Sequence, residues 1–220
     1  MDDYVKWPAA AALACAAALG LLALLVYGAD AFHHADLRAF TELSAYHHSR
    51  GGDLAEAIAA LADPLPLVGF LAVACAIALL RGRPRDALAA TLVVAGANIT
   101  TQALKAVLAH PRAQTLLGGS GAAEVGFPSG HTTAACSIGI AFALVVPRGM
   151  APIVLALGAG FGLAVGLSVV VIAWHYPSDV IGGILVAAGW GFAVLAARRA
   201  AWPREPRGAG LSARGPLPSR

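Results

Sequence analysis

Residues 151–173, APIVLALGAGFGLAVGLSVVVIA, form an apolar stretch without a charged side chain. As an α-helix, a stretch of this length rises about 35 Å, which exceeds the roughly 30 Å hydrocarbon core of a bilayer. The whole chain of 220 residues is 59% hydrophobic and 12% charged. A soluble domain carries about 25% charged residues. The sequence therefore predicts an integral membrane protein.

Five other runs are also long enough to cross a bilayer. Only helices and closed barrels satisfy the backbone in lipid, and these runs lack the two-residue alternation of barrel strands. We therefore expect an all-α integral membrane protein, a six-transmembrane-helix bundle that forms a single domain over residues 1–197. The six predicted spans are 8–27, 61–80, 87–108, 130–147, 151–173 and 177–197.

The first run has two interpretations. The sequence GADA that follows it resembles the small-residue cleavage site of a signal peptide. However, Asp2 and Asp3 outweigh Lys6 ahead of the run, and the run is longer than an ordinary signal-peptide core. We interpret it as a retained first span.

The segments outside the spans differ in composition. Residues 28–60 are too polar to span, but DLAEAIAALADP within and just after them predicts a short helix at the outer interface or over the bundle. Residues 198–220 are rich in Pro, Gly and Arg without apolar periodicity, which predicts a disordered cytoplasmic tail. The cysteines fall separately inside apolar runs, which favours free thiols over disulfides or a zinc site; they are Cys15, Cys75 and Cys136.

The basic residues are divided unequally between the two ends of the predicted spans. One end holds 11 of the 15, and the positive-inside rule places that end and both termini in the cytoplasm. All seven histidines fall at the opposite, extracytoplasmic end. The net charge of +3 therefore reflects membrane orientation, and we expect no nucleic-acid partner. The 11 are Lys6, Arg81, Arg83, Arg85, Arg148, Arg198, Arg199, Arg204, Arg207, Arg214 and Arg220.

Small residues recur on one face of the fifth predicted span. Gly158, Gly162 and Gly166 are spaced four residues apart. Such a stripe lets membrane helices approach each other closely, so we interpret it as a packing surface.

Polar residues gather at the extracytoplasmic ends of spans three to six. In KAVLAHPR, residues 105–112, Lys105 and Arg112 are seven residues apart and share a face if the helix continues through Pro111. Two cations that face a bundle interior would bind an anion. The alternative is a lysine that extends to the interface.

The second cluster is GFPSGHTT, residues 126–133. Ser129 is a natural N-cap, and the free N–H groups of the following turn would bind a phosphate. Gly130 allows close backbone approach, and His131 could donate a proton to a leaving oxygen. The alternative is an ordinary cap beside an interfacial histidine.

The third cluster is WHYPSD, residues 174–179, in which His175 precedes Asp179 by four residues. A carboxylate beside a histidine orients the ring and stabilises its positive charge. Alternatively, the helix dipole favours Asp179 and His175 is merely interfacial. Because all three clusters lie at one end of a chain that avoids charge, together they favour a phosphoryl-transfer site.

In order and spacing these clusters resemble the three-part signature of the type 2 phosphatidic acid phosphatase family. The resemblance spans residues 105–179 and implies a membrane phosphatase that needs neither metal nor cofactor. It implies that His175 attacks phosphorus to form a phosphohistidine supported by Asp179, and that His131 protonates the leaving alcohol. The phosphate ligands that it implies are Lys105, Arg112, Ser129 and Gly130.

The chain departs from the family signature at two places. Pro111 precedes Arg112, and Ala113 stands where the signature has proline. More importantly, Val169 replaces the arginine that follows Ser168 in the signature. A buried charge-assisted hydrogen bond contributes roughly 1.5–3 kcal/mol, so we expect weakened or specialised activity. Replacement cations considered from the sequence are Arg38, Arg50 and protonated His110.

The sequence leaves two other functions open. A membrane serine protease using Ser129 and His175 would leave Lys105 without a role, and Phe127 replaces the first glycine of the usual Gly-x-Ser-Gly motif. A non-catalytic lipid-phosphate binder, flippase or transporter would tolerate Val169. The paired histidines 33–34 and 47–48 suggest metal binding, but adjacent loop histidines are more often solvated.

The resemblance implies a substrate with phosphate at the extracytoplasmic face of the cell membrane and its apolar part in lipid. Phosphatidic acid, phosphatidylglycerol phosphate and polyprenyl mono- or diphosphates all satisfy this requirement.

Overall fold

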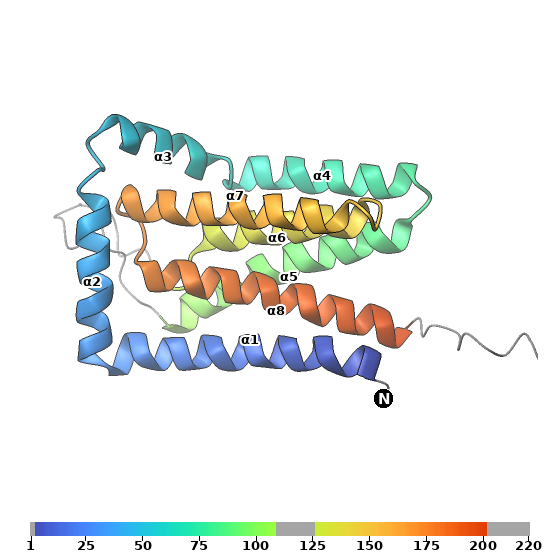
Figure 1. Ribbon diagram of the computed structural model, residues 1–220, viewed down its shortest axis with the longest axis horizontal. Coiled ribbons are helices and arrows are strands. Elements are labelled where there is room, and N and C mark those ends of the chain that lie inside the picture. The colour runs from blue at the N-terminus through green and yellow to red at the C-terminus, as the bar shows by residue number, and fades with distance from the viewer. Residues whose placement is uncertain (1–2, 109–125, 202–220) are drawn as a thin grey trace, which may run out of the picture.

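The computed structural model describes residues 3–108 and 126–201, and every regular element in these ranges is an α-helix. The long helices lie side by side along the long axis of the molecule, and α2 crosses one end of them (Figure 1). The helices are α1 (Asp3–Gly28), α2 (Asp30–Ser44), α3 (Arg50–Ala60), α4 (Pro64–Leu80), α5 (Pro84–Leu108), α6 (Gly130–Val145), α7 (Ala151–Val171) and α8 (Pro177–Ala201).

Helix α6 occupies the centre of the bundle, where it contacts α4, α5, α7 and α8. Its burial follows from its sequence, because Thr, Ala, Ser and Gly recur along it and allow neighbouring backbones to come close. Helix α1 packs mainly along α8 at the periphery. The residues that begin α6 and α8 are therefore held together by packing inside the bundle.

The all-helical membrane architecture predicted from the sequence is confirmed, and each of the six predicted runs is helical over most of its length. By length and composition, four helices can cross a membrane: α1, α5, α7 and α8. Helices α3 and α4, which meet at an angle of 50°, count as a fifth candidate when taken together. Helix α6 has 16 residues and is a shorter apolar helix.

The segment between the first two predicted spans differs from the prediction. Helix α3 corresponds to the expected short helix, but α2 was not expected. Its sequence DAFHHADLRAFTELS is too polar for a hydropathy criterion, yet it buries Phe40 against Val170 and Tyr176. An amphipathic helix of this kind is stabilised by packing one face.

The tail prediction also needs one correction. Helix α8 continues to Ala201, so residues 198–201 are helical. The reason is local packing: Arg199 donates a hydrogen bond to the carbonyl of Tyr4 and stacks on the rings of Tyr4 and Trp7. The predicted tail beyond Ala201 lies outside the described residues.

The glycine stripe is a packing surface, as predicted. A β-carbon built onto Gly158 would come within 2.5 Å of Cα of Gly139 on α6. A β-carbon on Gly162 would collide with Sγ of Cys136, and one on Gly166 would lie 2.6 Å from Val180 on α8. The three cysteines are free thiols, which confirms that prediction.

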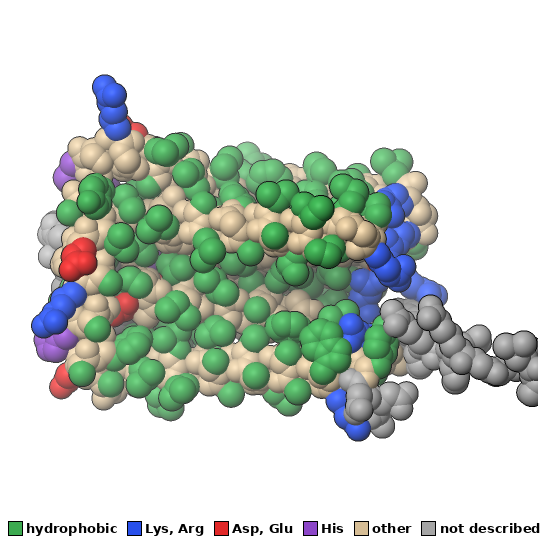
Figure 2. All heavy atoms as spheres, in the orientation of Figure 1, with side chains coloured by type: hydrophobic (Ala, Val, Ile, Leu, Met, Phe, Trp, Pro, Cys, Tyr) green, Lys and Arg blue, Asp and Glu red, His purple; other side chains and the backbone are tan. Residues whose placement is uncertain are grey.

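Charged side chains distinguish the two ends of the bundle (Figure 2). Basic side chains gather where the α4–α5 turn, the α6–α7 turn and the end of α8 meet; we call this the arginine end, defined by Arg81, Arg83, Arg85, Arg148, Arg198 and Arg199. The opposite end carries α2 and the start of α8. We call it the histidine end, defined by His33, His34, His47, His48, His131 and His175.

Candidate active site

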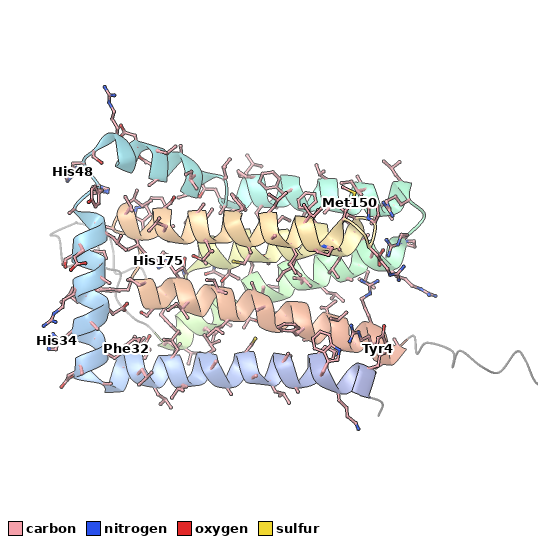
Figure 3. The ribbon with its side chains drawn as sticks, viewed as in Figure 1. Tyr4, Phe32, His34, His48, Met150 and His175 are labelled. Carbon is pink, nitrogen blue, oxygen red and sulfur yellow. The ribbon has the colours of Figure 1, made fainter. Side chains whose placement is uncertain are left out.

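His175 lies in the tight connection between α7 and α8 and is fully buried at the histidine end (Figure 3). The chain reverses at Ala173, which has φ of +61° in the left-handed region. The amides of Trp174 and His175 both donate to the carbonyl of Val169, at 2.9 and 3.1 Å. This closed turn fixes the backbone on which the imidazole stands.

Asp179 in the first turn of α8 orients the His175 ring. Nδ1 of His175 lies 3.1 Å from Oδ2 of Asp179, and both side chains are 0% exposed. The amide of Tyr176 donates to the same carboxylate oxygen at 3.0 Å. With Nδ1 held by the carboxylate, Nε2 is the ring nitrogen directed away from Asp179. This geometry suits a nucleophilic imidazole.

The N-termini of α6 and α8 are joined directly. Ser129 is the N-cap of α6: its Oγ accepts from the amide of Thr132 at 3.4 Å and from the Thr132 hydroxyl at 3.0 Å. The amide of Ser129 donates to the carbonyl of Asp179 at 2.9 Å. A β-carbon on Gly183 would lie 2.7 Å from the Ser129 carbonyl oxygen, so only glycine permits this approach. The positive ends of two helix dipoles thus meet at one place.

Lys105 reaches this place from the last turn of α5. A β-carbon built onto Gly130 would lie 3.7 Å from Nζ of Lys105 and 4.0 Å from Nε2 of Gln102. An ammonium beside exposed helix N–H groups is a strong site for an oxyanion. Arg112, its predicted partner cation, lies outside the described residues.

His131 in the first turn of α6 has a carboxylate partner that the sequence analysis missed. Its Nε2 lies 3.1 Å from Oδ1 of Asp63, and its ring centroid lies 5.2 Å from that of Trp174. The His131 side chain is 17% exposed and that of Asp63 is 48% exposed. Asp63 is 68 residues away in sequence; the only local signal was its position ahead of Pro64 at a helix start.

Asp36 on α2 is a second residue that the sequence analysis missed. Its carboxylate accepts from the amide of Ser178 at 3.0 Å and from the Ser178 hydroxyl at 2.5 Å, and so caps α8 next to Asp179. Burial and the nearby Asp179 raise the pKa of Asp36, an effect that the bonds from Ser178 only partly offset.

The ring of Tyr176 packs under the same helix. Its centroid lies 5.1 Å from that of Phe40 and 6.3 Å from that of His33. Burial, and secondarily the charges of Asp179 and Asp36, raise the pKa of Tyr176 to about 12. Helix α2 therefore covers the connection that carries His175.

Val169, which replaces the signature arginine, is fully buried in an apolar cluster with Ala55 and Ala59 of α3 and with Ile172. No cation is supplied from this position. Of the proposed replacements, Arg50 lines a cavity of about 620 Å³ that is also bounded by Trp174 and Ile172.

The sequence model of the PAP2 superfamily matches residues 86–203, more than half of the chain. The chain belongs to the PAP2 superfamily. The matched range includes all the site residues predicted from the sequence, from Lys105 to Asp179.

Two proteins of Bacillus subtilis are similar to this chain. Undecaprenyl-diphosphatase BcrC of Bacillus subtilis (strain 168) is 41% identical over 71 residues, which are 32% of this chain and 34% of BcrC, so the match spans about a third of that protein. The crystal structure of a transmembrane PAP2 type phosphatidylglycerolphosphate phosphatase from Bacillus subtilis aligns with a TM-score of 0.77. It is 19% identical, and the alignment covers 88% of this chain and 98% of that chain. At this identity the structural match establishes the fold.

Proposed function

We propose that this protein is a membrane phosphatase that hydrolyses a lipid or polyprenyl phosphate, mono- or diphosphate, without a metal. The observation that carries the proposal is the buried His175–Asp179 pair beside the joined N-termini of α6 and α8. The two similar proteins, whose names specify an undecaprenyl diphosphate and a phosphatidylglycerol phosphate, support this substrate class.

The proposed phosphate site uses the N-terminus of α6. Gly130 and the N–H groups of the first turn would contact two phosphate oxygens, with Ser129 closing the turn. Lys105 would neutralise the oxygens from α5, and Arg112 would complete the clamp. The electrostatic stabilisation grows as charge builds on the equatorial oxygens in the transition state.

In the proposed reaction Nε2 of His175 attacks phosphorus while the bond to the leaving oxygen breaks. His131 donates its proton to that oxygen, so the alcohol or monophosphate leaves neutralised. The His175 ring becomes positively charged, and Asp179 stabilises it through Nδ1. Water then attacks the phosphohistidine, His131 accepts the water proton, and inorganic phosphate is released with both histidines restored.

Asp63 has a defined part in this scheme. Its hydrogen bond to Nε2 holds the His131 ring at the start of α6, and its partial exposure provides a connection to water. The ring of Trp174 limits rotation from the other side. Together they would position the acid without contact with phosphate.

We further propose that residues 1–197 form one domain of six spans in the cell membrane, with both termini and the tail beyond residue 201 in the cytoplasm. The concentration of arginines at one end supports this orientation. The site at the histidine end would then face the extracytoplasmic side, where a phosphorylated headgroup lies at the interface and its lipid tail stays in the bilayer.

Purified protein and a panel of phosphorylated lipids test the proposal through release of inorganic phosphate. The panel contains phosphatidic acid, phosphatidylglycerol phosphate, and undecaprenyl mono- and diphosphate, each with excess chelator. We expect hydrolysis of at least one substrate, inhibition by vanadate, and complete loss in His175→Ala. His34→Ala, which removes an exposed histidine of α2, is the matched control.

Val169 is buried among apolar side chains and supplies no cation to the site. A second candidate function is therefore a lipid-phosphate binder, flippase or transporter that does not hydrolyse its ligand. Binding of a panel lipid with no phosphate release from any of them would favour this function. Hydrolysis that survives in His175→Ala would contradict the proposed mechanism.

A further inference from the structure

The arginine end contains a cavity of about 750 Å³, at the opposite end of the bundle from His175. Helices α1, α5, α6, α7 and α8 and the turns between them all contribute to its wall. Within residues 3–108 and 126–201, the charged side chains that line it are five arginines and one carboxylate: Arg83, Arg85, Arg148, Arg198, Arg199 and Asp86.

The arginines of this cavity are organised by packing. Asp86 is 2% exposed and receives Arg83 at 2.5 Å together with Arg198 from α8. The side chains of Arg83 and Arg198 are only 29% and 27% exposed. Arg199 is fixed by the Tyr4 carbonyl at 2.8 Å. The positive-inside rule requires positive charge at this end, but it does not require the side chains to converge on one hollow.

The charges around the cavity are unbalanced. Two of the five arginines share one buried carboxylate, so the lining side chains that the structure describes carry a net charge of +4. A planar guanidinium group can donate two parallel hydrogen bonds to two oxygens of one phosphate. The lining also includes apolar side chains, among them Leu144 and Leu195. The cavity therefore matches an amphipathic anion whose phosphate lies among arginines and whose chains begin beside the apolar side chains.

We propose that this cavity is a second, non-catalytic phosphate site, occupied by the headgroup of an anionic phospholipid from the leaflet at the arginine end. Basic pockets between membrane helices bind such headgroups in this way. The site is independent of the reaction at His175. Its ligand can be a phosphodiester, which the proposed phosphatase reaction does not consume.

The test measures binding of phosphatidylglycerol to purified protein in detergent, as the concentration dependence of the thermal denaturation midpoint. Phosphatidylcholine and inorganic phosphate are the comparison ligands. Arg148→Gln removes one exposed lining cation without disturbing the pairs around Asp86. Arg81→Gln removes the same charge at the same end but outside the cavity lining, so it is the matched control.

We expect phosphatidylglycerol, but not phosphatidylcholine, to raise the midpoint, with affinity about tenfold weaker in Arg148→Gln and unchanged in Arg81→Gln. Arg85→Gln should repeat the loss, and all three variants should keep wild-type phosphatase activity. Equal weakening in Arg148→Gln and Arg81→Gln would overturn the site. A different outcome is that inorganic phosphate raises the midpoint as much as phosphatidylglycerol does, with the effect lost in Arg148→Gln. That result would support a phosphate site in the cavity but would overturn its assignment to a lipid headgroup.

Discussion

Two histidines at the same end of the bundle occupy different environments, and their proposed roles follow from this difference. His175 is 0% exposed and held by the equally buried Asp179, which suits the fixed ring orientation that the proposed nucleophile needs. His131 is 17% exposed and held by Asp63, which is 48% exposed. A group that exchanges protons with a leaving oxygen and with water needs such access.

Replacing Asp179 by Asn tests the buried pair. The amide keeps the size of the side chain but cannot stabilise the positive ring that forms on His175 in the proposed reaction. We expect phosphate release to fall by about 10²- to 10⁴-fold with the substrate KM little changed. Steady-state kinetics measure this loss, and Asp53→Asn, an exposed acid on α3, is the control. Near wild-type turnover in Asp179→Asn would contradict the role of the pair.

Asp63→Asn tests the partner of His131. Because Asp63, in the proposed reaction, orients the acid His131 without contact with phosphate, we expect kcat to fall about three- to tenfold and KM to stay constant. The expected loss is small because Asp63 is half exposed, and exposed ion pairs contribute little. Asp63→Glu should restore part of kcat. A rise in KM alone would instead indicate that Asp63 acts in substrate binding.

The sequence predicts the residues of the site that depend on local geometry. His175 and Asp179 lie four residues apart at a helix start, and Ser129 caps the next helix along its own turn. Asp63 and Asp36 were missed because 68 and 142 residues separate them from their partners. Their positions depend on how α2 and α4 pack across the bundle, and hydropathy does not encode that.

At the scale of elements, α2 is the peripheral helix that contacts the residues around His175. Its Asp36 caps α8 through Ser178, and its Phe40 packs on Tyr176. The sequence predicted α3 and the apolar runs because their patterns are long or periodic. It did not predict α2, whose helicity depends on the surface that it covers.

Asp36→Asn tests this contact through the pH dependence of stability. Burial raises the pKa of Asp36 above its ordinary 3.8, so the folded state binds the proton more tightly than the unfolded state. The contribution of Asp36 to the free energy of unfolding of the wild-type protein therefore falls as the pH rises from 3.8 through the folded-state pKa. Asp36→Asn lacks this decline, so its denaturation midpoint relative to wild type should rise over that window.

Thermal denaturation of both proteins across the acid range measures the difference. Asp53→Asn on α3 controls for removal of a charge at the same end. A midpoint difference that is constant with pH, or that falls as the pH rises, would contradict the raised pKa of the partly buried Asp36 carboxyl group.

The contact between α6 and α7 is tested by two glycine substitutions on one helix. A β-carbon at Gly158 would lie 2.5 Å from Cα of Gly139, whereas nothing lies within 4 Å of one at Gly160. Overpacking costs about 1–3 kcal/mol, so we expect the midpoint of Gly158→Ala to fall by about 2–4 °C per kcal/mol. Gly160→Ala should be neutral or slightly stabilising. Equal midpoints for the two variants would contradict the close helix contact.

At the scale of the whole molecule, the protein is polarised along its long axis (Figure 2). The site lies at the end where α2 closes the bundle, and the arginine cavity lies at the other. The sequence predicted this polarity from the positions of Lys and Arg relative to the apolar runs. The number of spans is harder to predict from the sequence. The central helix α6 has only 16 residues, and it is stabilised by contacts with four neighbouring helices.

Cysteine labelling tests the orientation. In a variant without native cysteines, Tyr46→Cys places a thiol in the exposed α2–α3 turn, and Gly149→Cys places one in the exposed α6–α7 turn. We expect a membrane-impermeant maleimide to label position 46 in intact cells and position 149 only after permeabilisation. The reverse pattern would place the site in the cytoplasm and contradict the proposed orientation.

The most direct test of the central claim is to trap the phosphorylated enzyme. A hydrolysed panel substrate, labelled in its terminal phosphate, is mixed rapidly with wild-type protein and quenched in alkali, in which phosphohistidine is stable. We predict a transient label on the peptide that contains His175, absent from His175→Ala. Steady hydrolysis with no label on that peptide, or full turnover by His175→Ala, would contradict the account.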